Sequence, residues 1–256
     1  MKYIVKEECI LYDFLRNNYD GSKNNIKNFL KNGFIKVNNN IVYKYDYQLL
    51  VNDEVSISNN FINYDNYTIP IVYEDKDMII VDKPFGLLTI GTSKDKDHTL
   101  YNYVSKYLKE KNKNNKVFIV HRLDKDTGGI IVLAKNEKTK ELLQSNWHNT
   151  KRYYVAVVHG KALVKDSIVV NLKENPKTLE TYVSKYGDKA ITNYNLIKSN
   201  DKYSLLNIEI LTGKKNQIRV SLAYKKLPIL GDKKYGIKDN YKKLMLFANK
   251  LIINNK

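Results

Sequence analysis

The sequence predicts an α+β protein whose main part is a mixed, mostly antiparallel sheet with flanking helices, preceded by a small α/β unit. Short runs of alternating apolar and polar residues recur after residue 70, as is typical of half-buried strands. Stretches with apolar residues three and four positions apart lie between them and predict helices. We therefore expect domains at residues 1–58 and 70–256, joined by a linker at 59–69 that is rich in Asn and Tyr.

The composition limits the classes of protein to which the chain can belong. Its net charge of +17 suits a polyanionic partner such as nucleic acid or an anionic membrane face. The base composition of the genome also raises the lysine content and so contributes to this charge. Cys9 is the single cysteine, which excludes a disulfide within the chain and favours a reducing compartment. No apolar run approaches the roughly 20 residues that span a bilayer, and the first residues lack the apolar core of a signal peptide. We expect a cytoplasmic protein that binds no membrane.

Two helices open the first unit. Leu11, Phe14 and Leu15 recur at helical spacing, and a second apolar stripe follows at residues 26–30. Gly33 is expected to end the second helix, because glycine is common just past a helix C-terminus. Alternating residues then predict strands at 35–37 and 55–57.

The second of these helices carries a basic face. Lys27 and Lys31 are four residues apart and share a face, with Lys23 one turn earlier. A solvated helix surface explains such a face without any partner. The order of helix, basic helix, Gly, V-x-N and later D-x-V is, however, similar to the RNA-binding domain named after ribosomal protein S-four. This resemblance implies that Lys23, Lys27 and Lys31 contact phosphates of structured RNA.

The second unit begins with strands and a turn. Residues 72–74 and 78–81 alternate as strands, and the segment KPFGL follows at residues 83–87. Pro84 and Gly86 give this segment a structural role in a tight bend, while Lys83 is a candidate phosphate contact. Residues 99–111 predict a helix on the sheet, and Asn136 is a candidate N-cap of a helix that extends to about residue 146.

The string HRLDKDTGG at residues 121–129 lies between apolar runs at 117–120 and 130–134. Arg122 and Asp124 are two residues apart, so on an extended segment their side chains point to the same face. A loop with a local ion pair explains the pair without a function. A carboxylate and a guanidinium at the mouth of a sheet also suit a functional site.

The whole string resembles the HRLDxxT(S/T)G motif of the RluA-type pseudouridine synthases. In that family the aspartate is the catalytic nucleophile, which the resemblance assigns to Asp124. Gly128 departs from the family pattern, in which a small hydroxyl residue is usual. Further segments match the family in the same order, among them KPFGL.

Residues 151–160 predict a strand rich in β-formers and are similar to the family motif K/R-x-Y-x-A-x-V-x-G. Counting back from Gly160 places the family tyrosine on Tyr154, whereas the neighbouring Tyr153 would face the other way. Most of the chain's 21 tyrosines serve as core or surface residues, so only the motif spacing distinguishes Tyr154. Two more strands are predicted at residues 190–194 and 204–211.

The string TGKKNQIRV at residues 212–220 opens a predicted helix and resembles the family signature T-G-R-x-H-Q-I-R-V-H. Arg219 matches the active-site arginine of the family, although an exposed helix arginine is the plain alternative. Lys214 stands for the family arginine, Asn216 for the first histidine and Ser221 for the last. The resemblance implies that Lys214 and the adjacent Lys215 face RNA.

The segment LPILGDKKYG at residues 227–236 matches the family string x-P-I-x-G-D-x-x-Y-G. We expect it to form scaffold beneath the site, with Asp232 anchoring its loop through hydrogen bonds. A final strand is predicted at residues 244–253.

Together these resemblances imply an RNA pseudouridine synthase, an isomerase that needs no cofactor and acts on large-subunit ribosomal RNA. Catalysis would use Asp124, kept ionised by Arg219, and Tyr154 would stack on the flipped uracil. Arg122 would fill the position that the base leaves in the RNA stack. We then expect the protein to bind RNA and to be a monomer.

Two alternatives stay open at this point. The chain could be a non-catalytic RNA-binding factor of ribosome assembly, or the same isomerase could act on transfer RNA. A metal-dependent nuclease is disfavoured, because paired carboxylates at metal-binding spacing are missing and the four histidines show no ligand spacing. We therefore expect no metal.

Overall fold

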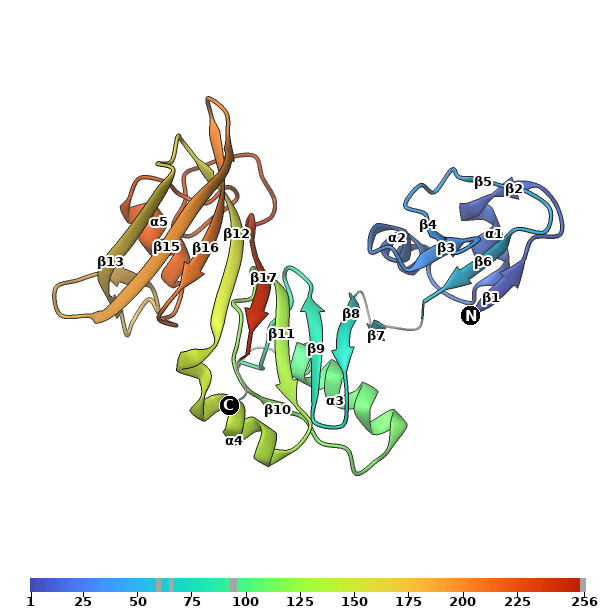
Figure 1. Cartoon of the computed structure of the whole chain (residues 1–256), viewed down its shortest axis with the longest axis horizontal. Coiled ribbons are helices and arrows are strands. Elements are labelled where there is room, and N and C mark those ends of the chain that lie inside the picture. Colours follow the sequence, from blue (N-terminus) through green and yellow to red (C-terminus); the bar gives the residue numbers. More distant parts are fainter. Residues whose placement is uncertain (59–60, 65–66, 93–95, 254–256) are drawn as a thin grey trace. The chain divides into compact units, whose positions relative to one another are not determined.

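A computed structural model gives the structure of the protein and describes residues 1–58, 61–64, 67–92 and 96–253 (Figure 1). It divides into two compact units, Met1–Tyr73 and Glu74–Lys256. Within the expected linker, β7 (Phe61–Tyr64) pairs with β8 (Tyr67–Glu74) in antiparallel register, so the described part of that segment is a hairpin. Ile62 opposes Ile69 across the pair and both side chains are buried, which gives these strands a face to bury. Residues 59–60 and 65–66 lie outside the described residues.

The first unit packs two helices against a small sheet. The helices are α1 (Leu11–Asn18) and α2 (Lys23–Lys31), and Ser22 caps α2 by accepting a hydrogen bond from the Asn25 amide. The sheet has the order β1-β6-β3-β4, beside a separate pair of β2 and β5. These strands are β1 (Lys2–Ile4), β2 (Cys9–Ile10), β3 (Ile35–Val37), β4 (Asn40–Ile41), β5 (Gln48–Leu49) and β6 (Glu54–Ile57). Both predicted helices and both predicted strands of this unit are present.

The second unit is built on one large sheet with the strand order β14-β13-β15-β16-β12-β17-β11-β9 (Figure 1). β10 pairs with Leu133 and Ala134 at the end of β11. Neighbours are antiparallel except β11 and β17, which run parallel. The predicted fold class, α+β with a mostly antiparallel mixed sheet, is confirmed. The strands are β9 (Met78–Lys83), β10 (Phe118–Ile119), β11 (Gly128–Ala134), β12 (Lys151–His159), β13 (Lys165–Glu174), β14 (Thr181–Val183), β15 (Asp188–Ser199), β16 (Tyr203–Ile210) and β17 (Leu246–Ile252).

Three helices accompany this sheet. α3 (Leu100–Lys111) and α4 (Glu137–Ser145) start where the sequence predicts, because Thr99 and Asn136 accept hydrogen bonds from the amides three residues on. A 3-10 turn (Trp147–Asn149) follows α4. α5 (Gln217–Tyr224) lies against β13, β14 and β15, and its Ile218 and Leu222 join the main core with Ile168 and Val170. This packing fixes α5, which carries Arg219, relative to the sheet.

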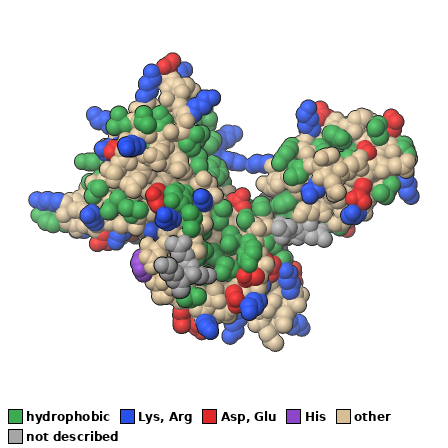
Figure 2. Space-filling model, in the orientation of Figure 1, with side chains coloured by type: hydrophobic (Ala, Val, Ile, Leu, Met, Phe, Trp, Pro, Cys, Tyr) green, Lys and Arg blue, Asp and Glu red, His purple; other side chains and the backbone are tan. Residues whose placement is uncertain are grey.

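The surface is rich in basic side chains. Figure 2 shows lysine and arginine side chains over the visible face of both units. The excess of basic over acidic residues, a net charge of +17, lies in the second unit. Among the helices of the described residues, none combines the length and apolar character of a membrane-spanning segment.

Candidate active site

Asp124 lies in the loop between β10 and β11, and two glycines set the end of that loop. Gly129 has φ +113°, and a Cβ atom there would lie 2.2 Å from the carbonyl oxygen of Ala248 on β17. Only glycine therefore allows β11 to approach β17 so closely. The Thr127 amide donates to the Asp124 carbonyl at 3.1 Å, which tightens the loop directly before β11.

Lys83 forms hydrogen bonds that anchor the same loop. Its side chain is 1% exposed, and its Nζ donates to the carbonyl oxygens of Pro84, Leu87 and Lys125 at 3.1, 2.7 and 3.1 Å. When Lys83 is protonated, each of its three ammonium protons thus has a backbone acceptor. The suggestion that Lys83 contacts phosphate is wrong, because the side chain is enclosed by the KPFGL turn and the Asp124 loop.

The Asp124 carboxylate faces two donors from the segment around α5. Its Oδ2 accepts a hydrogen bond from Asn216 Nδ2 and lies 3.9 Å from Nη1 of Arg219. The side chain of Asp124 remains 31% exposed, so the carboxylate is held but is also open to a ligand. The loop and α5, 92 residues apart in sequence, thus meet at this carboxylate.

Arg219 makes its strongest interaction elsewhere. Its Nε and Nη2 donate to the two oxygens of Asp232 at 2.8 and 2.7 Å, and the pair is almost fully buried. Despite the burial, the hydrogen bonds from Arg219 and from two loop amides hold the pKa of Asp232 below its usual range. Asp232 also accepts from the amides of Lys234 and Tyr235, so it anchors its loop as the sequence analysis expected.

Asn216 occupies the left-handed region, with φ 52° and ψ 22°, directly before α5. Its Oδ1 accepts a hydrogen bond from Tyr235 Oη at 3.1 Å, and that hydroxyl in turn accepts from the Thr181 amide at 3.0 Å. This chain of bonds fixes which end of the amide faces Asp124, so the NH₂ group is directed at the carboxylate. The sequence marked Asn216 only as a departure from the family histidine, and it gave no sign of the contact with Tyr235.

Tyr154 lies on β12, where a register shift between Tyr153 and Tyr154 interrupts the pairing with β17. Burial raises the pKa of the Tyr154 phenol to about 12, so the hydroxyl is protonated at neutral pH and can donate a hydrogen bond. Tyr154 lines the cavity described next, whereas Tyr153 does not.

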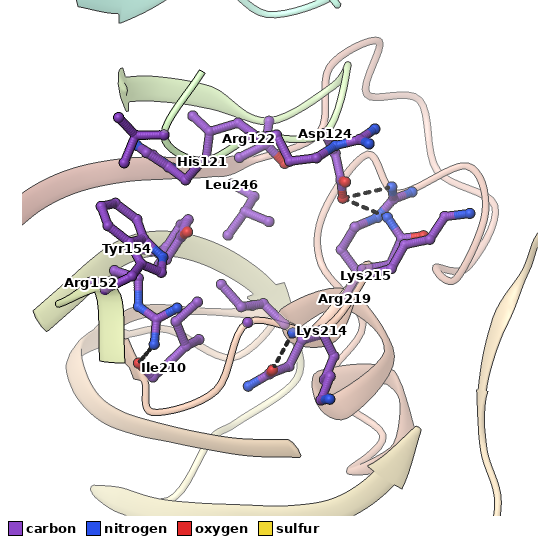
Figure 3. A pocket seen from close by; sticks show the side chains of 18 of the residues that line it. His121, Arg122, Asp124, Arg152, Tyr154, Ile210, Lys214, Lys215, Arg219 and Leu246 are labelled. Atoms are coloured by element: carbon purple, nitrogen blue, oxygen red, sulfur yellow. Dashed lines mark hydrogen bonds and ion pairs between the residues drawn. The ribbon is translucent and has the colours of Figure 1, made fainter. Parts of the chain in front are cut away.

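A cavity of about 590 Å³ joins these groups. Figure 3 shows Asp124, Arg219 and Lys215 on one side of it and Tyr154 and Arg152 on the other, with Leu246 between them. His121 and Trp147 also line it, with their rings stacked 4.5 Å apart. Because burial lowers the pKa of His121 to about 3, this imidazole is neutral, and its Nε2 accepts from the Val132 amide. The cavity therefore presents a carboxylate, aromatic surface and several cations to one ligand.

The basic residues predicted to bind RNA fall into two places. Arg122 is exposed and lines the cavity. Lys214 and Lys215 also line it, and each already forms an ion pair, with Asp188 at 2.8 Å and with Glu174 respectively. Lys23, Lys27 and Lys31 are exposed on α2 of the first unit.

A metal centre finds no support in the part of the chain that the structure describes. No group of three or more His, Cys, Asp or Glu side chains there could hold an ion.

Comparison with known proteins places this fold and cavity in context. A family model described as RNA pseudouridylate synthase matches residues 77–224. An uncharacterized RNA pseudouridine synthase of Mycoplasma genitalium is 34% identical over 240 residues, which cover 86% of this chain and 75% of that protein. The ribosomal large subunit pseudouridine synthase D of Borreliella burgdorferi is 33% identical over 277 residues, covering 99% of this chain and 85% of that protein.

Among solved structures, Human RNA Pseudouridylate Synthase Domain Containing 4 superposes with a TM-score of 0.62 at 22% identity. The match covers 72% of this chain and 83% of the human one, and it shows a common fold.

Proposed function

The chain belongs to the RNA pseudouridylate synthase family and is an isomerase that converts uridine in RNA to pseudouridine, and from this we propose that Asp124 is its catalytic nucleophile and large-subunit ribosomal RNA its substrate. The position of the Asp124 carboxylate supports its role as nucleophile. The carboxylate is bound by Asn216, lies close to Arg219 and is open to a cavity that Tyr154 also lines.

The reaction needs a carboxylate, a place for a detached base and no outside reactant. The bond between uracil N1 and the ribose C1′ breaks, the base turns, and C5 joins C1′, while one proton leaves C5 and one arrives at N1. Asp124 would attack C1′ and form a glycosyl ester that C5 then displaces. Abstraction of the neighbouring C2′ proton is the second route open to the same carboxylate. Asn216 and Arg219 hold the Asp124 carboxylate in place for either route.

Tyr154 and Arg122 have complementary tasks in this proposal. The Tyr154 ring would stack on the flipped uracil, as aromatic rings do in enzymes that extrude a base. The exposed guanidinium of Arg122 would occupy the vacated position in the RNA stack. Lys214 and Lys215, beside the cavity, would exchange their carboxylate partners for RNA phosphates.

The ribosomal target is supported by two kinds of observation. Relatives from Borreliella burgdorferi and Buchnera aphidicola are named ribosomal large subunit pseudouridine synthase D. The net charge of +17 favours a large structured polyanion. We assign residues 1–58 to an S-four-like RNA-binding domain with Lys23, Lys27 and Lys31 on its RNA face, and residues 70–256 to the catalytic domain. In this proposal the enzyme acts as a cytoplasmic monomer, since its single thiol at Cys9 suits a reducing compartment.

Asp124→Asn tests the catalytic assignment. The variant keeps the shape and removes the charge, so turnover should fall below detection while RNA affinity stays within about tenfold. Release of hydrogen from C5 of labelled uridine in RNA measures turnover, and filter binding measures affinity. Retained isomerase activity would remove Asp124 from the mechanism.

The target is tested by mapping pseudouridine in all RNA of cells that lack the protein. We expect the loss of sites in large-subunit ribosomal RNA and their return when the wild-type protein, but not Asp124→Asn, is supplied. Sites lost only from transfer RNA would overturn the ribosomal part of the proposal and leave the isomerase assignment intact.

A further inference from the structure

Arg152, on β12, is a buried cation that no carboxylate of the described residues neutralises. Its residue is 7% exposed, and its Nη2 donates to the carbonyl oxygens of Ile210 and Leu211 at 3.4 and 3.2 Å. Its buried Nε has no hydrogen-bond partner among the residues that the structure describes. Within the described residues Arg152 forms no ion pair, whereas the equally buried Arg219 is bound by Asp232.

Such an arrangement is costly unless a ligand completes it. A buried charge is stabilised by a partner of opposite charge, and buried donors in folded proteins are nearly always bonded. The burial also lowers the pKa of the Arg152 guanidinium. Because Arg152 lines the cavity, the missing anion can come from whatever occupies that cavity.

The space beside the guanidinium is kept free by Gly213. A Cβ atom at that position would lie 2.9 Å from Nη1 of Arg152, and Gly213 itself lines the cavity. The two backbone carbonyls hold Nη2 from the other side, so the guanidinium is fixed before any ligand arrives.

Arg152 and Tyr154 share one face of β12, since residues two apart on a strand point the same way. Figure 3 shows both on the side of the cavity away from Asp124 and Arg219. With the ribose at Asp124, a base that reaches Tyr154 would also reach Arg152. The cation therefore lies where the base of a bound nucleotide would be, while Arg122 and Lys215 lie nearer the carboxylate end.

We propose that Arg152 binds the detached uracil and stabilises the negative charge that it carries between the two bond-making steps. When the N1–C1′ bond breaks, its electron pair goes to the base, and the charge spreads over the N1 and carbonyl oxygens of uracil. The charge disappears when C5 joins C1′ and the C5 proton is lost to leave N1 protonated. Both routes open to Asp124 produce this anion, so the inference rests on the proposed function but not on the choice between the routes.

The test compares a neutral and an anionic base in equilibrium binding. UMP and 6-hydroxy-UMP, whose base is ionised at neutral pH, are titrated into the full-length protein and followed by NMR. We expect the wild type to prefer the anionic nucleotide at least about tenfold and Arg152→Gln to lose that preference. Arg122→Gln is the matched control, because it removes an exposed cation of the same cavity and should keep the preference.

Gly213→Ala provides a second variant that leaves β12 intact. Its Cβ would crowd Nη1, so the preference for 6-hydroxy-UMP should shrink while UMP binding changes little. Arg152→Lys keeps a charge and should restore part of the preference. In isomerisation of RNA, Arg152→Gln should lower kcat by about 10²–10³, as the loss of one fixed charge-stabilising donor does, with KM within about threefold.

The outcomes separate the alternatives. If Arg152→Gln weakens UMP and 6-hydroxy-UMP equally, the guanidinium serves the phosphate or the fold and the inference is overturned. If Arg152→Gln keeps the wild-type preference, the inference is overturned as well. Failure of the proposed function would instead appear as unchanged isomerisation by Asp124→Asn, which no result with Arg152 variants can produce.

Discussion

At the scale of single residues, Asp124 is held by a neutral amide at hydrogen-bond distance and by a cation 3.9 Å away. Arg219 is largely committed to Asp232, so it supplies positive potential more than a direct bond. The Asn216 amide, oriented by Tyr235, therefore sets the direction of the carboxylate.

Asn216→Asp should move the pH dependence of isomerisation. A second carboxylate beside Asp124 raises the pKa of the pair, because two like charges at this distance disfavour joint ionisation. Since the protonated carboxyl is inactive, lowering the pH should reduce the rate of the variant at a higher pH than it reduces the rate of the wild type. Raising the pH should restore the rate. Single-turnover rates measured from pH 5 to pH 9 report this shift.

Asn216→Gly is the control for that measurement. Glycine accepts the left-handed backbone at this position without strain, and it removes the amide without adding charge. It should lower the rate and move the acidic limb less than Asn216→Asp does. If the acidic limbs of the pH–rate profiles of the wild type and Asn216→Asp coincide, the side chain at position 216 does not influence Asp124.

Lys83 gives a prediction for stability. Burial lowers its pKa to about 7 from an ordinary value of 10.5. Between these values the unfolded chain binds a proton that the folded protein lacks, so this residue makes the free energy of unfolding rise with pH. The stability of the wild type relative to Lys83→Met should therefore increase above pH 7 by up to about 1.4 kcal/mol per pH unit.

Urea unfolding at pH 7, 8 and 9 measures this difference. Lys125→Met, at an exposed position in the same loop, should show no such dependence. A wild-type advantage over Lys83→Met that stays flat across this range would mean that Lys83 keeps its proton on folding.

Sequence patterns gave the candidate site residues from short motifs but not the contacts that support them. Asn216, Tyr235 and Thr181 are joined only by folding, so no local pattern connects them. Arg152 stands at the first position of the motif that contains Tyr154, but only the fold shows that its buried Nε lacks a partner among the described residues. Lys83 was misread because a lysine in a turn is usually exposed, and only the structure shows the three carbonyls around it.

At the scale of elements, local signals were sufficient for the helices. Asn136 caps α4 as expected, and the apolar stripe of residues 100, 104 and 108 marks the buried face of α3. The strand β13 was not predicted, although Ile168, Val170 and Leu172 alternate in its sequence and are buried. Val169 is apolar although it is exposed, so the apolar–polar alternation is broken there and the two-residue period of a strand is not recognisable in the sequence. The β7–β8 hairpin was missed because its cross-strand pairing is not visible in a stretch rich in Asn and Tyr.

Gly129 and Gly128 form a matched pair for testing the junction of β11 and β17. Gly129→Ala combines φ +113° with a Cβ 2.2 Å from the Ala248 oxygen, and should cost about 3 kcal/mol or more of stability. A Cβ atom at Gly128 would lie 3.2 Å from the Phe247 ring, which is 43% exposed and can move, and 3.4 Å from the Lys83 carbonyl oxygen, which is an ordinary contact distance. We expect a change within about 1 kcal/mol for Gly128→Ala in urea unfolding. Similar losses in both variants would contradict this account of the junction.

At the scale of the whole molecule, the net charge of +17 belongs to the second unit, because the first unit holds equal numbers of basic and acidic residues, eight of each. Charge of this kind strengthens binding to any nucleic acid and makes it depend on salt. The choice of uridine must then come from the cavity and from the shape of the RNA.

Replacing Lys23 and Lys27 by Gln tests the proposed RNA face of the first unit. If each contacts a phosphate, the slope of log K against log salt should become shallower by about two, and binding of structured RNA should weaken. Fluorescence anisotropy at several salt concentrations measures the slope. Lys2→Gln with Lys6→Gln removes the same charge from that unit and should change the slope less; equal changes would indicate diffuse attraction without a defined face.

The position of β17 has a consequence for how the enzyme becomes active. Asp124 precedes β11 and Tyr154 lies on β12, and the strand that joins these two is made of residues 246–252. During synthesis, most of both halves can form while they are still separate, because their shared neighbour has not yet left the ribosome. Insertion of that later segment closes the sheet and creates the pocket in one event, so a nascent chain should be unable to modify RNA until residues 246–252 have left the ribosome.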